Sequence, residues 1–283
     1  LFARYQRSEQ ALVLAMMVNS VCLCLTFKCD LECRHCFLSA SPYRNEEMSK
    51  LQMLTAIENS YKSVKRMYFS GGEPTLNFEK LLAGLRFAKL KKEAHGYPQN
   101  ICVQTNGNFA SSEKEAREKL MAMAECGANE IDFTSYDNFH FEQMEKSLLI
   151  MTVKIAKYEN IFDRVTIGGT SSKSMKMLGR ASQISRDELE LSGYILANEC
   201  VYTGSDYIFN PDGTVLPCCY GYSHSMGNIF EETLENILMS EKAIRTRCFL
   251  REVREGRLKK YSSDSNQYEE ICNICNSINL EGT

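Results

Sequence analysis

Three cysteines near the start of the chain, Cys29, Cys33 and Cys36, have the spacing of a metal site. They form the pattern C-x3-C-x2-C directly after the apolar segment 21–27. Three thiolates at this spacing can converge from one loop on three irons of a [4Fe–4S] cluster, which leaves the fourth iron without a protein ligand. An open iron can bind and reduce a small molecule, whereas a fourth cysteine would give a closed electron carrier. The alternative is that the three cysteines are simply buried without a metal.

The composition indicates a globular chain that keeps its thiols reduced. With 283 residues, of which 44% are hydrophobic, the chain can form one large domain, or one domain with a small appendage. No stretch approaches about 18 consecutive apolar residues, so we expect no membrane span. A net charge of −3 without a basic block argues against nucleic acid as a partner. Thirteen cysteines without an export signal favour metal binding in a reducing compartment, so we expect a cytoplasmic protein in a low-oxygen setting.

Alternating strand and helix signals follow the cysteine loop. Expected strands after 21–27 are 66–70, 101–104, 130–134 and 164–168, and expected helices are 78–92, 112–126 and 141–157. Repeated βα units predict an α/β fold with a parallel sheet, open or closed into a barrel. Ligand sites in such sheets lie at the carboxyl ends of the strands, which is where the polar motifs of this chain fall.

The pattern changes near residue 185. Segments 207–210 and 215–217 predict a hairpin around Pro211-Asp212-Gly213, and helical signals follow at 231–239 and 241–255. We therefore expect an N-terminal helix over 1–20, an α/β domain over 21–185 and a small α+β domain over 186–283.

Two motifs together resemble the radical S-adenosylmethionine (SAM) superfamily: the three cysteines, and Gly71-Gly72-Glu73-Pro74 after the second expected strand. The resemblance implies a partial (β/α) barrel of five or six parallel strands, whose cluster reduces SAM to a 5′-deoxyadenosyl radical. It also implies that the two glycines let the backbone approach SAM and that Glu73 accepts from its amino group. By analogy, further SAM contacts are expected from Thr105, Asn106, Ser135, Asp137 and Arg180, although ordinary loop polarity is an alternative for each.

The tail contains a second group of cysteines: Cys200, Cys218, Cys272 and Cys275. Their order, with the hairpin between the first two, resembles the twitch (SPASM-like) extension of radical SAM enzymes. That extension holds one auxiliary [4Fe–4S] cluster, so the expected cofactors are two [4Fe–4S] clusters and SAM. The spacing alone would also suit a Cys₄ zinc site.

Cys219 directly follows the expected ligand Cys218 and is expected to have a different role. Adjacent residues of an extended chain point to opposite sides, so Cys219 can face a substrate cavity if Cys218 faces the cluster. A thiol there can donate a hydrogen atom to a carbon radical, although a buried small hydrophobe is the simpler alternative. Cys248 is a weaker candidate donor. For Cys22, Cys24, Cys102 and Cys126 we expect core packing.

Pro217-Cys218-Cys219, the terminal Cys-x2-Cys and the segment 135–140 resemble the radical SAM peptide epimerases, which convert L-residues of ribosomal peptides to D. The first hypothesis is therefore an epimerase that acts on a peptide Cα with Cys219 as donor. The chain between 140 and 180 is short, which resembles the twitch dehydrogenase of aminoglycoside biosynthesis. Alternatives are thus a dehydrogenase, a peptide cross-linking enzyme, or an epimerase of an aminoglycoside or cyclitol. A non-catalytic electron-transfer or zinc-binding module is a third hypothesis. The enzymes imply an electron donor such as flavodoxin or ferredoxin.

Overall fold

The computed structural model describes residues 18–135, 137–168, 174–192, 194–196, 199–257, 271–278 and 280. Most of the expected N-terminal helix lies outside these residues, and the first strand, β1 (Val18–Cys24), already begins inside the range 1–20. Within the described part of the chain, no helix has the length and apolar character needed to cross a membrane.

One sheet runs through the whole molecule. It contains β1, β2 (Val64–Ser70), β3 (Asn100–Thr105), β4 (Glu130–Phe133), β5 (Arg164–Ile167), β8 (Asp206–Phe209), β9 (Thr214–Leu216) and β10 (Gly227–Asn228). Their order is β10-β9-β8-β1-β2-β3-β4-β5. The strands from β8 to β5 pair in parallel, whereas β9 and β10 pair antiparallel at the β8 end. The expected partial barrel of parallel strands is confirmed, and its sixth strand, β8, comes from the C-terminal region.

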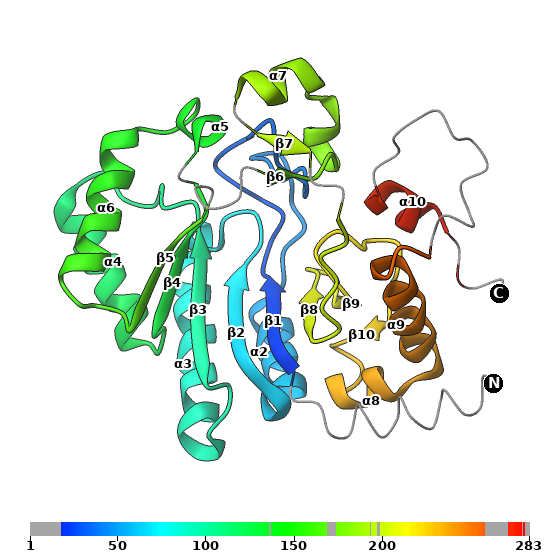
Figure 1. Ribbon diagram of the computed structural model, residues 1–283. Helices are drawn as coiled ribbons and strands as arrows, with labels where there is room; N and C mark the ends of the chain where they lie inside the picture. The colour runs from blue at the N-terminus through cyan, green and yellow to red at the C-terminus, as the bar shows by residue number, and fades with distance from the viewer. Residues whose placement is uncertain are drawn as a thin grey trace.

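A helical layer covers the outer face of the sheet (Figure 1). It contains α2 (Lys50–Ser60), α3 (Phe78–His95), α4 (Glu113–Glu125) and α6 (Lys146–Tyr158). Alternate strand residues such as Val21, Leu23 and Phe69 are fully buried and belong to the core formed with these helices. The expected helix over 141–157 begins later, at Lys146 of α6, because Phe141 ends a separate short helix, α5 (Asn138–Phe141), that the Asp137 side chain caps, and residues 142–145 are not helical.

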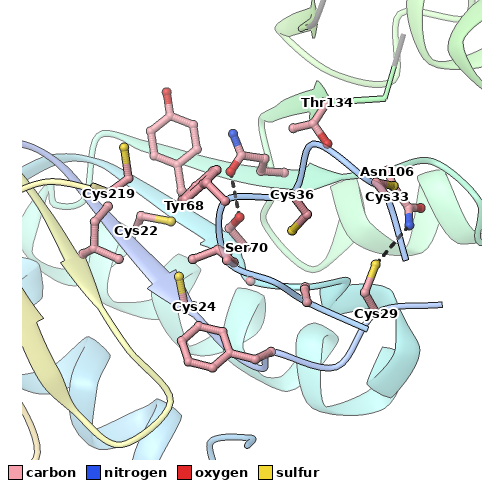
Figure 2. Close-up of a pocket in the computed structure, with 18 of the residues that line it drawn as sticks. Cys22, Cys24, Cys29, Cys33, Cys36, Tyr68, Ser70, Asn106, Thr134 and Cys219 are labelled. Atoms are coloured by element: carbon pink, nitrogen blue, oxygen red, sulfur yellow. Dashed lines mark hydrogen bonds between the residues drawn. The ribbon is translucent and has the colours of Figure 1, made fainter. Parts of the chain in front are cut away.

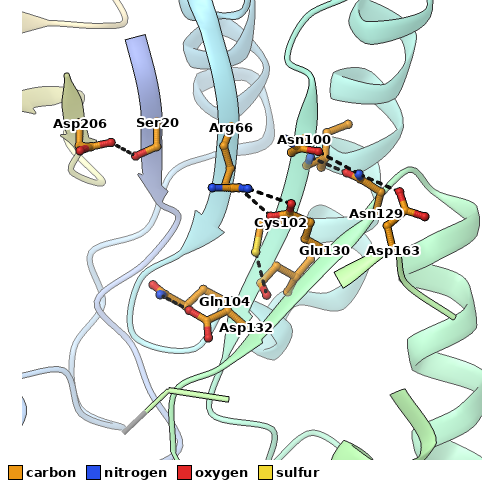
Figure 3. Close-up of polar contacts among 12 residues, drawn as sticks. Ser20, Arg66, Asn100, Cys102, Gln104, Asn129, Glu130, Asp132, Asp163 and Asp206 are labelled. Atoms are coloured by element: carbon orange, nitrogen blue, oxygen red, sulfur yellow. Dashed lines mark hydrogen bonds and ion pairs between the residues drawn. The ribbon is translucent and has the colours of Figure 1, made fainter. Parts of the chain in front are cut away.

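The opposite face of the sheet is polar and faces the inside of the barrel (Figure 3). Arg66 on β2 reaches over β3 to Glu130 on β4 and donates two hydrogen bonds, of 2.7 and 3.0 Å. Gln104 Nε2 donates to Asp132 Oδ2 over 3.0 Å. The Arg66–Glu130 pair offsets the cost of burying two charges, whereas Asp132 Oδ1 is buried without a hydrogen-bond partner, and burial raises the pKa of Asp132.

Smaller elements cover the carboxyl ends of the strands and the β8 side. The strands β6 (Ser174–Met175) and β7 (Ile195–Leu196) lie with α7 (Arg186–Leu191) beyond the carboxyl ends of the central strands (Figure 1). Short 3₁₀ turns are η1 (Tyr61–Ser63), η2 (Pro74–Asn77) and η3 (Gly179–Gln183). On the other side, α8 (Leu234–Met239) packs against α2, and α9 (Glu241–Arg254) contacts α8 and α10 (Ile271–Ser277).

Candidate active site and auxiliary site

A cavity of about 700 Å³ opens at the carboxyl ends of the parallel strands. We call it the barrel cavity. Its wall is formed by β1, β2 and β3, by the loop 28–41 that follows β1 (the cluster loop), and by residues after β9. Cys29, Cys33 and Cys36 line it together, as the sequence predicts (Figure 2).

The three cysteines of the cluster loop fit the ligand set of a [4Fe–4S] cluster with one open iron. The loop is fixed by backbone bonds from Cys29 N to Ser41 O, 3.1 Å, and from Cys36 N to Cys33 O, 3.1 Å. Burial raises the pKa of Cys33 to about 12 and also raises the pKa of Cys29. Thiolates are therefore unfavourable here without a cation, and bound iron would replace the protons.

Gly71 and Gly72 are required by a close approach of two loops. Gly72 N donates to Thr26 O over 2.6 Å, and Glu73 N donates to Lys28 O over 2.9 Å. A Cβ on Gly71 would lie 2.3 Å from Thr26 O, and one on Gly72 would lie 2.1 Å from Lys28 O. The glycines thus seat their loop on the chain that leads into the cluster loop, in addition to lining the cavity themselves.

Glu73 lies at the centre of a buried hydrogen-bond network. Its carboxylate accepts from Thr75 N and Oγ1, 3.1 and 2.6 Å, from Thr105 Oγ1, 2.8 Å, and from Asn106 N, 2.8 Å. Burial raises the pKa of Glu73 to about 7, although these hydrogen bonds oppose the shift. Asn106 continues the network to the cluster loop, since its Nδ2 donates to Asp30 Oδ1 over 2.8 Å.

Arg180 binds the cluster loop itself. Nε donates to Cys33 O over 2.9 Å, Nη2 donates to Ala40 O over 2.6 Å, and the backbone N donates to Cys36 O over 3.1 Å. These bonds hold the three-cysteine loop in place. The guanidinium lines the cavity while it makes these contacts, so its expected pairing with the SAM carboxylate stays a prediction.

The other expected SAM contacts are only partly on the cavity wall. Gly71, Gly72, Thr105 and Asn106 line the cavity, whereas Glu73, Pro74, Ser135 and Asp137 are not among its lining residues. The hydroxyl of Ser135 donates to the carbonyl of Asn106.

Asp137 forms a polar group with two histidines. His140 Nδ1 lies 2.7 Å from its Oδ2, and His35 Nε2 lies 3.7 Å from the same atom. Burial raises the pKa of Asp137, but the hydrogen bond to His140 and the nearby rings outweigh it and lower the pKa overall. His35, inside the cluster loop, stacks on Phe139 and shields this side of the cavity.

Cys219 lies on the same cavity wall as two further thiols, Cys22 and Cys24 (Figure 2). Cys22 and Cys24 were expected to pack in the core; they alternate with the buried Val21 and Leu23 and line the cavity, although Cys24 is itself buried. The alternation of residues along 20–25 in the sequence already indicates that Cys22 and Cys24 share one face of the strand. Cys248 lies on α9 and is not among the residues that line the cavity.

The four cysteines of the tail converge on a second, smaller cavity, which we call the auxiliary site: Cys200, Cys218, Cys272 and Cys275. Tyr202, Leu250 and Val253 surround it with apolar side chains. Four thiols around one apolar cavity fit a fully ligated metal or iron–sulfur centre. His224, to which the sequence assigns no role, contacts Cys275 at this site.

Comparisons with known proteins agree with this geometry. The pattern of the radical SAM superfamily matches residues 23–173, and that of SPASM, an iron–sulfur cluster-binding domain, matches residues 200–276. YydG of Bacillus subtilis (strain 168), which is named as a peptide biosynthesis protein, is 23% identical over 305 residues, covering 93% of this chain and 92% of YydG.

Two solved structures share the fold. BtrN in complex with AdoMet (SAM) and 2-DOIA superposes with a TM-score of 0.55 at 18% identity, covering 89% of this chain and 96% of BtrN. The enzyme anSMEcpe with bound AdoMet gives a TM-score of 0.51 at 14% identity, covering 92% of this chain and 95% of the other.

These matches identify the cofactors. The radical SAM region implies a [4Fe–4S] cluster and SAM, and the SPASM region implies auxiliary iron–sulfur binding in place of the zinc alternative. The superfamily match also spans more than half of the 283 residues. The chain therefore belongs to the radical SAM superfamily, as an enzyme with a C-terminal SPASM domain.

Proposed function

We propose that this radical SAM enzyme is an epimerase, which inverts an sp³ carbon, preferably the Cα of an L-residue in a ribosomally made peptide. The observation that carries the proposal is the position of Cys219. Its thiol lines the same cavity as Cys29, Cys33 and Cys36, while its neighbour Cys218 belongs to the auxiliary site. A substrate in the barrel cavity would thus have a hydrogen donor beside it.

Cys219 is suited to donate a hydrogen atom. Burial raises the pKa of its thiol well above the usual value, so the S–H bond is intact at neutral pH. The cluster and SAM, when bound, supply the carbon radical that removes one hydrogen atom from the substrate. Cys219 then gives its hydrogen atom to the substrate carbon from the other face, and its sulfur keeps one unpaired electron.

The Cys219 thiol must be restored after each inversion. One electron and one proton convert the sulfur radical back to S–H, and a low-potential carrier such as flavodoxin or ferredoxin is the electron source we propose. Because Cys218 and Cys219 are adjacent, the auxiliary site lies next to the radical that needs this electron.

A peptide substrate is favoured by two observations. YydG, which is similar to this chain along almost its full length, is named for peptide biosynthesis. The cavity of about 700 Å³ must also hold the cluster and SAM, and polar side chains on its wall, such as Gln104, Thr134 and Asn210, offer hydrogen bonds to peptide groups.

The test is turnover of a pooled library of short all-L peptides in D₂O, with SAM and dithionite, by anaerobically reconstituted enzyme. An epimerase should give products in which one hydrogen of an inverted residue is replaced by deuterium, detected by mass spectrometry and chiral amino-acid analysis. A dehydrogenase or cross-linking enzyme should instead give products that have lost two hydrogens, and this result would overturn the proposal.

Cys219→Ala tests the donor. The variant should retain iron and still form 5′-deoxyadenosine, but inversion should fall below detection, because no thiol remains at that position. Cys248→Ala is the matched control, since Cys248 does not line the cavity, and it should invert normally. If Cys219→Ala inverts at the wild-type rate, and Cys22→Ala or Cys24→Ala does not, the donor is on β1 instead.

A further inference from the structure

His224 is a buried histidine beside the auxiliary site. Its residue is 3% exposed, and it follows Cys218 by six positions in a tight turn in which His224 N donates to Gly221 O over 3.1 Å. The imidazole lies against Phe249 of α9, with ring centroids 5.3 Å apart. This packing holds the ring against Cys275 of α10.

The imidazole contacts Cys275 through a single nitrogen. Nε2 is 2.8 Å from Cys275 O and 3.4 Å from Cys275 Sγ. A carbonyl oxygen can only accept, so Nε2 must carry the proton. The same N–H then has two acceptors within reach, the carbonyl and the sulfur of one residue, which is the geometry of a shared hydrogen bond.

Cys218, on the other side of the auxiliary site, is also supplied with donors. The backbone N–H groups of Tyr220 and Gly221 lower the pKa of its thiol, and Gly221 N donates to Cys218 O over 3.2 Å. A Cβ on Gly221 would lie 3.0 Å from Cys218 Sγ, so the backbone approaches this sulfur closely. His224 adds a side-chain donor at Cys275, and the apolar side chains of Leu250 and Val253 also lie at this site.

Hydrogen bonds to cysteine sulfurs are one of the main factors that set the potential of an iron–sulfur cluster. Reduction adds negative charge to the cluster and its sulfurs, so an N–H donor stabilises the reduced state more than the oxidised state. The effect is strong where water is excluded, because the local dielectric constant is low.

We propose that His224 is a positioning residue that raises the reduction potential of the auxiliary cluster through its Nε2–H bond to the Cys275 sulfur, while its bond to the Cys275 carbonyl holds the ligand in place. The proposal rests on Cys275 being a cluster ligand, and it is independent of the substrate and of epimerisation. It gives the auxiliary cluster a tuned potential, set by a residue outside the four cysteines.

The test is an electrochemical titration, monitored by electron paramagnetic resonance, of the full-length protein with Cys29, Cys33 and Cys36 replaced by alanine, so that only the auxiliary cluster is observed. His224→Phe keeps the ring contact with Phe249 and removes the donor. At a fixed ambient potential its ratio of reduced to oxidised cluster should fall about tenfold, which is ~59 mV for a one-electron couple. His95→Phe, at the exposed end of α3, is the control and should match the parent.

His224→Gln separates tuning from simple support of the fold, since its amide can place an N–H near the same sulfur. This variant should recover most of the lost ratio. Equal potentials in the parent and in His224→Phe, with iron retained in both, would overturn the proposal. If His224→Phe does not retain iron, His224→Gln decides: a parent-like potential supports the role, and a tenfold lower ratio contradicts it. Cys275→Ser separately tests the ligand assignment by its iron content.

Discussion

Glu73, which is 1% exposed and is not among the residues that line the barrel cavity, is the residue that we propose accepts from the amino group of SAM. Its carboxylate is held by Thr75, Thr105 and Asn106, yet burial leaves its pKa at about 7, above the ordinary value of a glutamate. Oε1 accepts three of the four hydrogen bonds and Oε2 accepts only that of Asn106 N. Oε2 is therefore the atom that we expect to accept from the amino group of SAM.

SAM affinity should accordingly increase with pH through neutrality. Below pH 7 Glu73 is protonated and neutral, so it attracts the amino group less, and above pH 7 it is ionised. The ionised fraction differs about tenfold between roughly pH 6 and roughly pH 8, so the dissociation constant should be about tenfold larger at the lower pH. Anaerobic titration calorimetry at the two pH values measures this dissociation constant. Glu73→Gln corrects for titration of SAM itself, and an identical pH profile in that variant would exclude Glu73 as the cause.

The roles of single residues could be predicted where they depend on a motif within the sequence. The three-cysteine motif, Gly71-Gly72 and the four tail cysteines are recognisable by spacing, and the structure brings each set together. His224 was not predictable, because its partner Cys275 lies 51 residues further along the chain. Arg180 was expected near SAM, but its contacts to Cys33 O and Ala40 O depend on the fold of two distant loops.

At the scale of elements, the loop of Gly71 and Gly72 is held against the segment that leads into the cluster loop. Gly71 has φ of 136° and its Cβ would meet a backbone carbonyl, which cannot move aside as a flexible side chain can. Gly96, which ends α3 with φ of 78°, has nothing within 4 Å of a Cβ. Comparing the two positions therefore distinguishes the energetic cost of a positive φ from the cost of steric overlap.

Alanine substitutions at these positions should differ in their cost. Gly96→Ala should lower the free energy of unfolding by roughly 1–2 kcal/mol, the cost of a left-handed conformation for a residue with a Cβ. Gly71→Ala should lose clearly more, and should also retain less iron, since the displaced Thr26 lies just before the cluster loop. Urea unfolding and iron analysis test both variants. Equal losses of stability would show that overlap with Thr26 O is relieved at no cost.

Element boundaries illustrate where sequence patterns are sufficient and where they are not. The alternation of strands and helices was predicted because each element has its own periodicity and end signals, such as the Ser112 cap of α4. The start of the helix expected over 141–157 was placed too early, because Phe141 belongs to the short helix α5, which depends on a single capping side chain, Asp137. Helix α2 is missing from the expected elements, although the capping box of Ser49 and Gln52 at its start is visible in the sequence.

At the scale of the whole molecule, the two regions share one sheet. The sequence predicted the hairpin of β8 and β9. The pairing of β8 with β1 joins residues 186 positions apart, for example Ser20 with Asp206, and no local pattern specifies it. Ser20 Oγ donates to Asp206 Oδ1 over 2.5 Å across this junction (Figure 3). The expected boundary at 185/186 therefore separates regions of the chain that remain joined through the sheet.

The shared sheet predicts that the barrel region cannot fold alone. A chain ending at residue 199 would lack β8, leave β1 as an exposed edge and remove the buried side chains of Tyr207, Phe209 and Ile237 from the common core. We expect this chain to be insoluble, or to show no cooperative thermal unfolding when it is followed by circular dichroism.

A chain ending at residue 257 is the matched control: it keeps β8, β9 and α9 and lacks only Cys272 and Cys275 among the tail cysteines. That chain should unfold cooperatively and retain the iron of the cluster loop while it loses the iron of the auxiliary site. A monomeric, cooperatively folded 1–199 fragment that binds SAM would contradict this account, because β1 would then need no partner from the C-terminal region.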